Sequence, residues 1–139
     1  MVDFGSLPNR IQQIAKAELQ PDEQICLCVL GRSSLLHPDF VLITNRRVLI
    51  LDEKYMGSLA VSYANVRCNL PFSDINTVNL ARFLKHRILG QARLEINVKR
   101  NMYCIDNMSY REARRAHTLI AQHIQNENGH ILDIPDCTT

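Results

Sequence analysis

The stretch Phe40-Val41-Leu42-Ile43-Thr44-Asn45-Arg46-Arg47-Val48-Leu49-Ile50-Leu51 decides the fold of this chain. It contains two runs rich in branched apolar residues, 40–44 and 48–51, on either side of a short polar segment. Branched side chains pack well on a pleated sheet, and asparagine tolerates the backbone angles of a tight turn. The stretch therefore predicts two strands joined by a hairpin.

Further strand signals lie on both sides of this hairpin. The clearest is Ala92 to Val98, where apolar and polar residues alternate with the period of a half-buried strand. The polar segment from Glu53 to Gly57 predicts a turn, and Pro71 predicts a bend or a sheet edge. The remaining runs with strand character are 25–30, 58–63, 66–72, 75–80 and 102–105. With 92–98 and the two hairpin strands these are eight runs, of which 58–63 is the weakest, so the sequence predicts about seven strands.

Amphipathic helices are predicted at both ends of this strand-rich region. Leu7, Ile11, Ile14 and Ala15 form one apolar stripe, so we expect a helix over 7–19 with Ser6 as its N-cap. The second helix begins at Ser109-Tyr110-Arg111-Glu112, whose spacing is typical of a capping box, and ends at Asn128-Gly129. The expected organisation is an N-terminal helix packed on the domain (1–20), the domain itself (21–128) and a tail (129–139).

Composition indicates one globular domain. The chain has 139 residues, of which 46% are hydrophobic and 22% charged. No apolar run approaches the roughly 20 residues that cross a bilayer, and the first six residues lack the profile of a secretion signal. The five cysteines are odd in number and have no framework spacing. We therefore expect free thiols and a cytoplasmic protein.

No residue pattern points to catalysis. The five glycines are widely spaced, and no nucleophile, base or carboxylate pair is grouped in a local motif. Cys26 and Cys28 share one face of a predicted strand and could begin a metal site, but no second ligand pair follows. We expect them to be buried cysteines, and we expect no catalytic residue, cofactor, metal or small-molecule substrate.

The strongest candidate site is the basic patch Arg82-Phe83-Leu84-Lys85-His86-Arg87. Between positions 82 and 115, nine Lys or Arg against three acids leave a net charge of +6. Arg82, Lys85 and Arg87 could lie against an anionic membrane or an acidic protein, with Phe83 and Leu84 as the apolar anchor. The alternative is a strand and loop whose charges are solvated and whose two apolar residues lie in the core. Nucleic acid is disfavoured, because aromatic content is 6% and there is no Trp.

Two other segments carry alternatives. Arg46-Arg47 at the hairpin tip could clamp a carboxylate or phosphate, or could stabilise the turn or pair with a nearby acid such as Asp74. The tail contains Ile131, Leu132 and Ile134, which are apolar although the last helix has ended. They either fold back on their own sheet or pack against a neighbouring copy, for example by adding a strand to its edge.

Three stretches together resemble the bacterial pleckstrin-homology-like domain family. They are Glu18-Leu19-Gln20-Pro21-Asp22-Glu23-Gln24-Ile25, Val41-Leu42-Ile43-Thr44-Asn45-Arg46-Arg47-Val48-Leu49 and Leu70-Pro71-Phe72-Ser73-Asp74-Ile75-Asn76-Thr77-Val78. The match covers about residues 18–124. It implies a mainly β fold with helices: a short N-terminal helix, a seven-stranded bent antiparallel sheet or partly open barrel, and a C-terminal capping helix.

The resemblance also bears on function. Some members of the family assemble into rings, and the eukaryotic relatives that bind phosphoinositides use a basic loop between the first two strands. Here that loop, 32–39, holds one arginine and one acid. Because phosphate binding needs several converging donors, no head-group pocket is expected there.

These observations favour a non-catalytic binding or assembly module. We expect it to form homo-oligomers or to dock another protein. The alternative is peripheral binding to an anionic membrane through the basic patch, and an enzyme is a distant third possibility.

Overall fold

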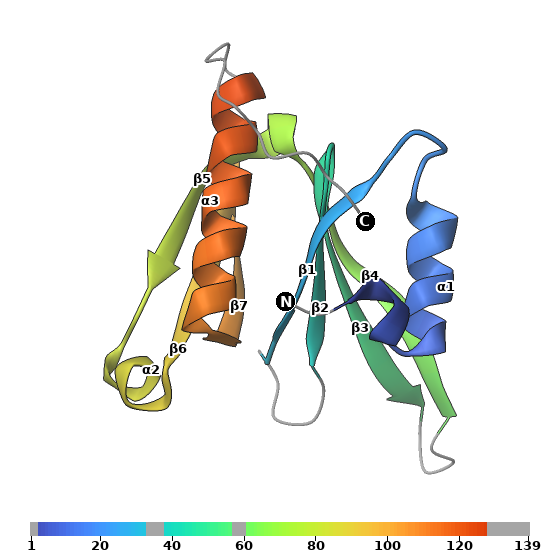
Figure 1. Ribbon diagram of the computed structural model, residues 1–139, viewed down its shortest axis with the longest axis horizontal. Helices are drawn as coiled ribbons and strands as arrows, with labels where there is room; N and C mark the ends of the chain where they lie inside the picture. The colour runs from blue at the N-terminus through green and yellow to red at the C-terminus, as the bar shows by residue number, and fades with distance from the viewer. Residues whose placement is uncertain (1–2, 33–37, 57–60, 128–139) are drawn as a thin grey trace.

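The chain folds into two antiparallel sheets that face each other (Figure 1). The computed structural model describes residues 3–32, 38–56 and 61–127. Sheet A has the strand order β1-β2-β3-β4, and sheet B has the order β5-β6-β7. The elements are α1 (Asn9–Glu18), β1 (Ile25–Gly31), β2 (Asp39–Thr44), β3 (Arg47–Met56), β4 (Val61–Pro71), η3 (Phe72–Asp74), β5 (Ile75–Ala81), α2 (Leu84–Leu89), β6 (Gln91–Val98), β7 (Asn101–Ser109) and α3 (Tyr110–Glu127). The predicted fold class is confirmed, with the strands divided between two sheets instead of closing one barrel.

Most of the predicted elements are present. The hairpin of β2 and β3 turns at Asn45-Arg46, and Ile43 pairs with Val48 next to it. Pro71 ends β4, which is one of the two edge strands of sheet A, and the short 3-10 helix η3 then leads the chain into sheet B. Both the edge and the bend predicted at this proline are therefore confirmed.

Other expectations about the elements are wrong. The turn expected over 53–57 is not formed at 53–56, because β3 continues to Met56 and pairs with β4 from Arg47↔Pro71 to Met56↔Val61. Gly57 lies outside the described residues. In place of the separate strands expected at 58–63 and 66–72, residues 61–71 form the single strand β4, and 58–60 lie outside the described residues. The first helix begins at Asn9 after Pro8, and the hydroxyl of Ser6 donates to the carbonyl of Asp3 without capping that helix. The helix α2 was not predicted.

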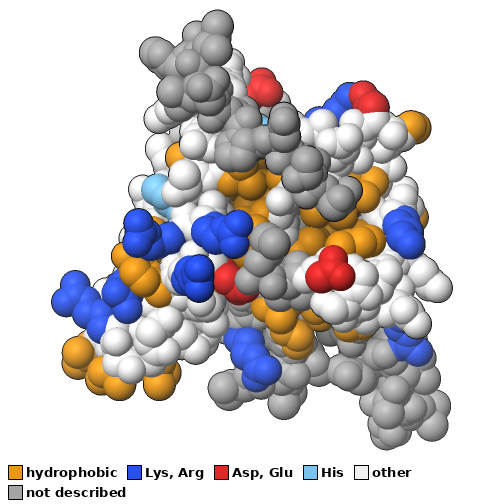
Figure 2. All heavy atoms as spheres, viewed as in Figure 1, with side chains coloured by type: hydrophobic (Ala, Val, Ile, Leu, Met, Phe, Trp, Pro, Cys, Tyr) orange, Lys and Arg blue, Asp and Glu red, His pale blue; other side chains and the backbone are white. Residues whose placement is uncertain are grey.

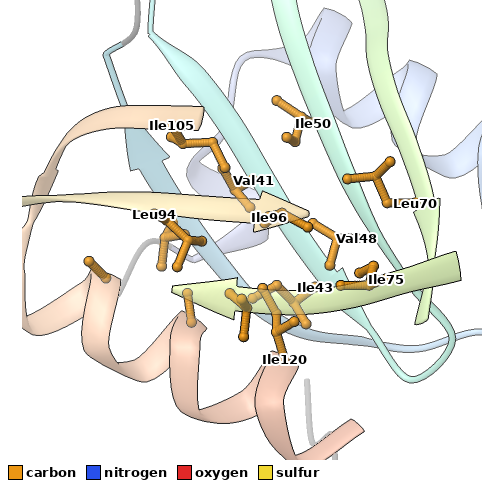
Figure 3. Close-up of a cluster of buried hydrophobic side chains, with 14 of the residues drawn as sticks. Val41, Ile43, Val48, Ile50, Leu70, Ile75, Leu94, Ile96, Ile105 and Ile120 are labelled. Carbon is orange, nitrogen blue, oxygen red and sulfur yellow. The ribbon is translucent and has the colours of Figure 1, made fainter. Parts of the chain in front are cut away.

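Sheet A is buried on both faces, which explains the uninterrupted apolar run of β2. Val41 and Ile43 point into a core between the two sheets, together with Leu94 of β6 (Figure 3). Phe40 and Leu42 point to the opposite face and pack against α1. The main core is closed by α3, whose side chains Ala113, Ala116, Ile120 and Ile124 are buried in it.

A buried polar cluster joins the segment before β1 to the β2–β3 hairpin. The Glu23 carboxylate accepts hydrogen bonds from the Thr44 hydroxyl at 2.8 Å and from Arg47 Nε at 2.8 Å and Nη2 at 2.9 Å. The Thr44 oxygen in turn accepts the amides of Arg46 and Arg47 at the turn. Burial raises the pKa of Glu23, but the hydrogen bonds from Arg47, the Gln20 amide and Thr44 outweigh it and lower that pKa below its usual value of 4.5.

The two tip arginines therefore act within the fold. Arg46 pairs with Asp22 and Arg47 with Glu23. The prediction that Arg46 and Arg47 pair with nearby acids is therefore confirmed, although the acids are Asp22 and Glu23 and not Asp74.

A second polar contact holds α3 against the bend between the sheets. His123 stacks on Phe72 of η3, with ring centroids 4.2 Å apart and planes 6° from parallel. Its Nε2 atom is buried and has no hydrogen-bond partner among the described residues. Burial therefore lowers the pKa of His123 below its usual value of 6.5.

Three cysteines in the described residues are reduced, and one is part of a disulfide. Cys28, Cys68 and Cys104 are reduced thiols as predicted, whereas the prediction is wrong for Cys26, which is disulfide-bonded. The tail 129–139, with the candidate self-association residues Ile131, Leu132 and Ile134, lies outside the described residues. Among the helices that the structure describes, none is long and apolar enough to cross a membrane.

Replacing Arg47 with Met should lower the free energy of unfolding by about 3–5 kcal/mol, because it leaves the Glu23 carboxylate buried without its charge partner. Arg46→Met is the matched control. Its ion pair with Asp22 is exposed, so we expect a loss below about 1 kcal/mol. Urea unfolding of both variants measures the difference, and equal losses would contradict the role given to Glu23.

The stability of the fold should also depend on the protonation of His123. Because its pKa is lower in the folded state, the stability it contributes is fully present above pH 6.5 and is lost as the pH falls below that value. His123→Phe keeps the ring that stacks on Phe72 and removes the titration. Urea unfolding across this pH range should show a weaker loss for the variant than for the wild type; parallel curves would refute the assignment.

Candidate docking surface

The predicted basic patch lies on α2, a short helix at one end of sheet B (Figure 1). The side chains of Phe83, Leu84, Ile88 and Leu89 are exposed there, with 49%, 75%, 74% and 65% of their surface accessible. The expectation of a strand and loop with Phe83 and Leu84 in the core is therefore wrong. The structure instead presents four large apolar side chains to solvent within seven residues.

Two capping contacts explain why so short a helix forms. At its start, the Phe83 amide donates to Nδ1 of His86 at 3.0 Å, so a histidine takes the place that Glu or Gln holds in a capping box. At its end, Gly90 adopts φ of +66°, a left-handed conformation that suits glycine. The carbonyl of Gly90 also accepts the amide of Tyr110 at 3.0 Å, which joins α2 to the start of α3.

The carboxylate of Asp106, on β7 of sheet B, binds side chains of α2 and so attaches the helix to the sheet. It accepts hydrogen bonds from Nε2 of the fully buried His86 at 2.6 Å and from Nζ of Lys85 at 3.1 Å. It also accepts Nη2 of Arg93 at 3.3 Å and the amide of Asn107 at 2.9 Å. The Phe83 amide can only donate, so His86 is the tautomer that carries its proton on Nε2.

A β-bulge brings Asp106 to this position. In the register of β6 and β7, Ala92 pairs with Met108 and Leu94 with Ile105, so Asp106 and Asn107 both stand opposite Arg93. Asn107 has a φ of +53°, and the extra residue re-aims the Asp106 side chain toward α2. Burial raises the pKa of Asp106, but the hydrogen bonds it accepts outweigh this effect and hold that pKa well below its usual value of 3.8.

Four cations surround the exposed apolar side chains. Lys85 and Arg87 are exposed, whereas Arg82 is half-buried, with its guanidinium 3.9 Å above the Tyr110 ring. Arg93 lies 4.8 Å above the ring of Phe83. We call this set the α2 surface: Phe83, Leu84, Ile88 and Leu89 with Arg82, Lys85, Arg87 and Arg93.

The candidate residues chosen from the sequence, Arg82, Phe83, Lys85 and Arg87, are all brought together on this surface. Sequence reasoning missed Ile88 and Leu89, although the two adjacent apolar residues directly follow the patch. It also missed Asp106, for which no local signal exists, because the residue lies on a distant strand and is aimed by a bulge.

The other histidines and acids that could carry chemistry form no site in the described part of the chain. His117 bonds the carbonyl of Val78 at 3.2 Å, and His123 is buried. Asp39, at the end of the first loop, is buried and pairs with Arg67 at 2.6 Å. Within 3–32, 38–56 and 61–127, no three His, Cys, Asp or Glu side chains gather in an arrangement that could hold a metal ion.

Replacing Asp106 with Asn should loosen α2, because a neutral amide cannot replace the charged acceptor of His86, Lys85 and Arg93. The loss of such a hydrogen bond costs about 1.5–3 kcal/mol, so amide exchange in α2 should accelerate about tenfold or more. Lys85→Ala is the control, since it removes only an exposed partner and should change exchange little. Hydrogen exchange followed by NMR measures both, and unchanged α2 amides in the Asp106 variant would contradict this role.

Comparisons with known proteins agree with this architecture. The family model described as bacterial PH domain matches residues 19–122. The structure is similar to that of a DUF1696 family protein with a pleckstrin-homology domain from Shewanella loihica PV-4, with a TM-score of 0.57 and 13% identity over 88% of this chain and 94% of that one. It is also similar to a pleckstrin homology domain from Shewanella amazonensis SB2B, with a TM-score of 0.57 and 12% identity over 88% of this chain and 89% of that one.

At such identities the two structures show the fold alone. No curated protein sequence matches the chain. The family model, however, spans most of the chain, and its range contains both sheets and most of α3. The chain belongs to the bacterial PH domain family.

Proposed function

We propose that this chain is a non-catalytic binding module that docks through the α2 surface onto a partner whose surface is anionic and can cover apolar side chains. The observation that carries the proposal is the exposure of four large apolar side chains within seven consecutive residues of one short helix and its N-cap: Phe83, Leu84, Ile88 and Leu89. Burying a large apolar side chain completely contributes about 1.5–3 kcal/mol, so a partner that covers all four would gain a substantial binding free energy.

Contiguous exposed apolar groups with a polar rim are typical of interaction sites on soluble proteins. Here the rim is cationic, since Lys85 and Arg87 project beside the apolar residues. An anionic partner therefore complements both parts of the surface: its negative charges meet the rim, and its apolar part covers the helix.

The surface is also held in one arrangement before binding. Hydrogen bonds from His86 and Lys85 to Asp106 and from Phe83 to His86 position α2 on sheet B. A surface ordered in advance loses little conformational entropy when it binds, which favours affinity.

Self-association through Ile131, Leu132 and Ile134 is a separate prediction and is no part of this proposal.

The proposal is tested with a small probe that has the same chemistry as the proposed partner. Anilinonaphthalene sulfonate is an anionic and apolar dye, and it is titrated into the isotopically labelled full chain while amide NMR shifts are followed. We expect the largest shift changes in residues 82–93. The double variant Leu84→Ser/Ile88→Ser should lose them, because it removes the two most exposed apolar side chains.

Met102→Ser is the matched control. Met102 is also exposed, at 54%, but it pairs with Asn97 at the opposite end of β6 from α2. This variant should respond to the dye like the wild type. Shift changes spread over other surfaces, or equal losses in both variants, would overturn the proposal.

A further inference from the structure

We infer that the partner covering the α2 surface is an anionic lipid bilayer, into which the apolar side chains of α2 insert while the surrounding cations meet lipid phosphates. This inference rests on the proposed function and names its partner.

The shape and size of the surface favour a bilayer over a protein. The helix α2 projects at the end of sheet B (Figure 1), and its large apolar side chains are exposed there. A stable protein interface takes about 20–30 residues from each side, more than this small projecting surface supplies. A bilayer needs less, because a few inserted side chains and several nearby cations are sufficient for peripheral binding.

A second group of cations extends the rim along α3. The first turns of this helix carry the exposed residues Arg111, Arg114 and Arg115. They lie beside α2, because the Tyr110 amide bonds the Gly90 carbonyl and because the guanidinium groups of Arg82 and Arg114 both lie on the Tyr110 ring. Figure 2 shows the Lys and Arg side chains gathered over α2 and the neighbouring half of α3.

The cations differ in their availability. Lys85 and Arg93 share Asp106, whereas no ion pair to Arg87, Arg111 or Arg115 occurs among the described residues. These last three are spread over two elements and do not converge on one point. We therefore expect recognition of negative charge at a membrane surface, without selection of a particular head group.

Vesicle co-sedimentation with the full chain tests the inference. The vesicles contain phosphatidylcholine alone or phosphatidylcholine with phosphatidylglycerol, at low salt and at about 0.15 M salt. We expect binding to the anionic vesicles only, weakened by salt. Leu84→Ser/Ile88→Ser should lower the partition coefficient about tenfold or more, and Arg87→Gln/Arg111→Gln should lower it roughly fivefold for each cation removed.

Lys99→Gln/Arg100→Gln is the matched charge control. It removes the same charge from the β6–β7 turn, at the other end of the sheet, and should bind like the wild type. The inference is overturned if this control weakens binding as much as the Arg87 and Arg111 pair, or if anionic vesicles are not bound at low salt.

The outcomes separate the two proposals. If the dye perturbs α2 while vesicles are not bound, the proposed docking function stands, and the partner is an acidic protein. If the dye does not perturb α2, the docking function itself fails.

Discussion

The buried ion pair of Glu23 with Arg47 is the interaction on which the rest of the structure depends. It joins the entry to β1 with the tip of the β2–β3 hairpin, and Thr44 connects the two by accepting both turn amides and donating to Glu23. The same turn reaches the bend between the sheets, since the amide of Phe72 donates to the carbonyl of Arg46 at 3.2 Å. The three sequence stretches that resemble the family thus meet at one place. Because a buried charge without its partner is costly, this geometry admits few alternatives.

The two sheets diverge from the β2–β3 hairpin, and the α2 surface lies far from that hairpin, at the other end of sheet B (Figure 1). The bulge in β7 directs Asp106 toward α2, and the adjacent β1 approaches closely enough for the Arg32 amide to donate to the Asp106 carbonyl at 2.7 Å. Gly31 is needed for this approach, since a Cβ there would lie 2.2 Å from a methyl carbon of Ile105. The part of sheet B that supports α2 therefore also forms part of the contact between the two sheets.

Predictions from the sequence succeeded where the signal was local. The alternation in Ala92 to Val98 and the apolar stripe with Ile11 and Ala15 report which face of each element is buried, and both elements formed as expected. Predictions from the sequence failed where pairing with a neighbouring strand determines how far a strand extends. Polar residues after Asp52 suggested a turn, yet backbone pairing with β4 continues β3 to Met56, because ladder hydrogen bonds do not depend on side-chain polarity.

Local patterns in the sequence indicated the β2–β3 hairpin, the strand β6, and the clustering of cations with Phe83 and Leu84 in one segment. Only the tertiary structure decided that this segment is a helix with its apolar side chains outside. The helix has six residues, too few to be stable alone, and its form depends on His86 reaching Asp106 across 20 positions of sequence. A contact between residues so far apart exists only after β6 and β7 have paired, so no local pattern could reveal it.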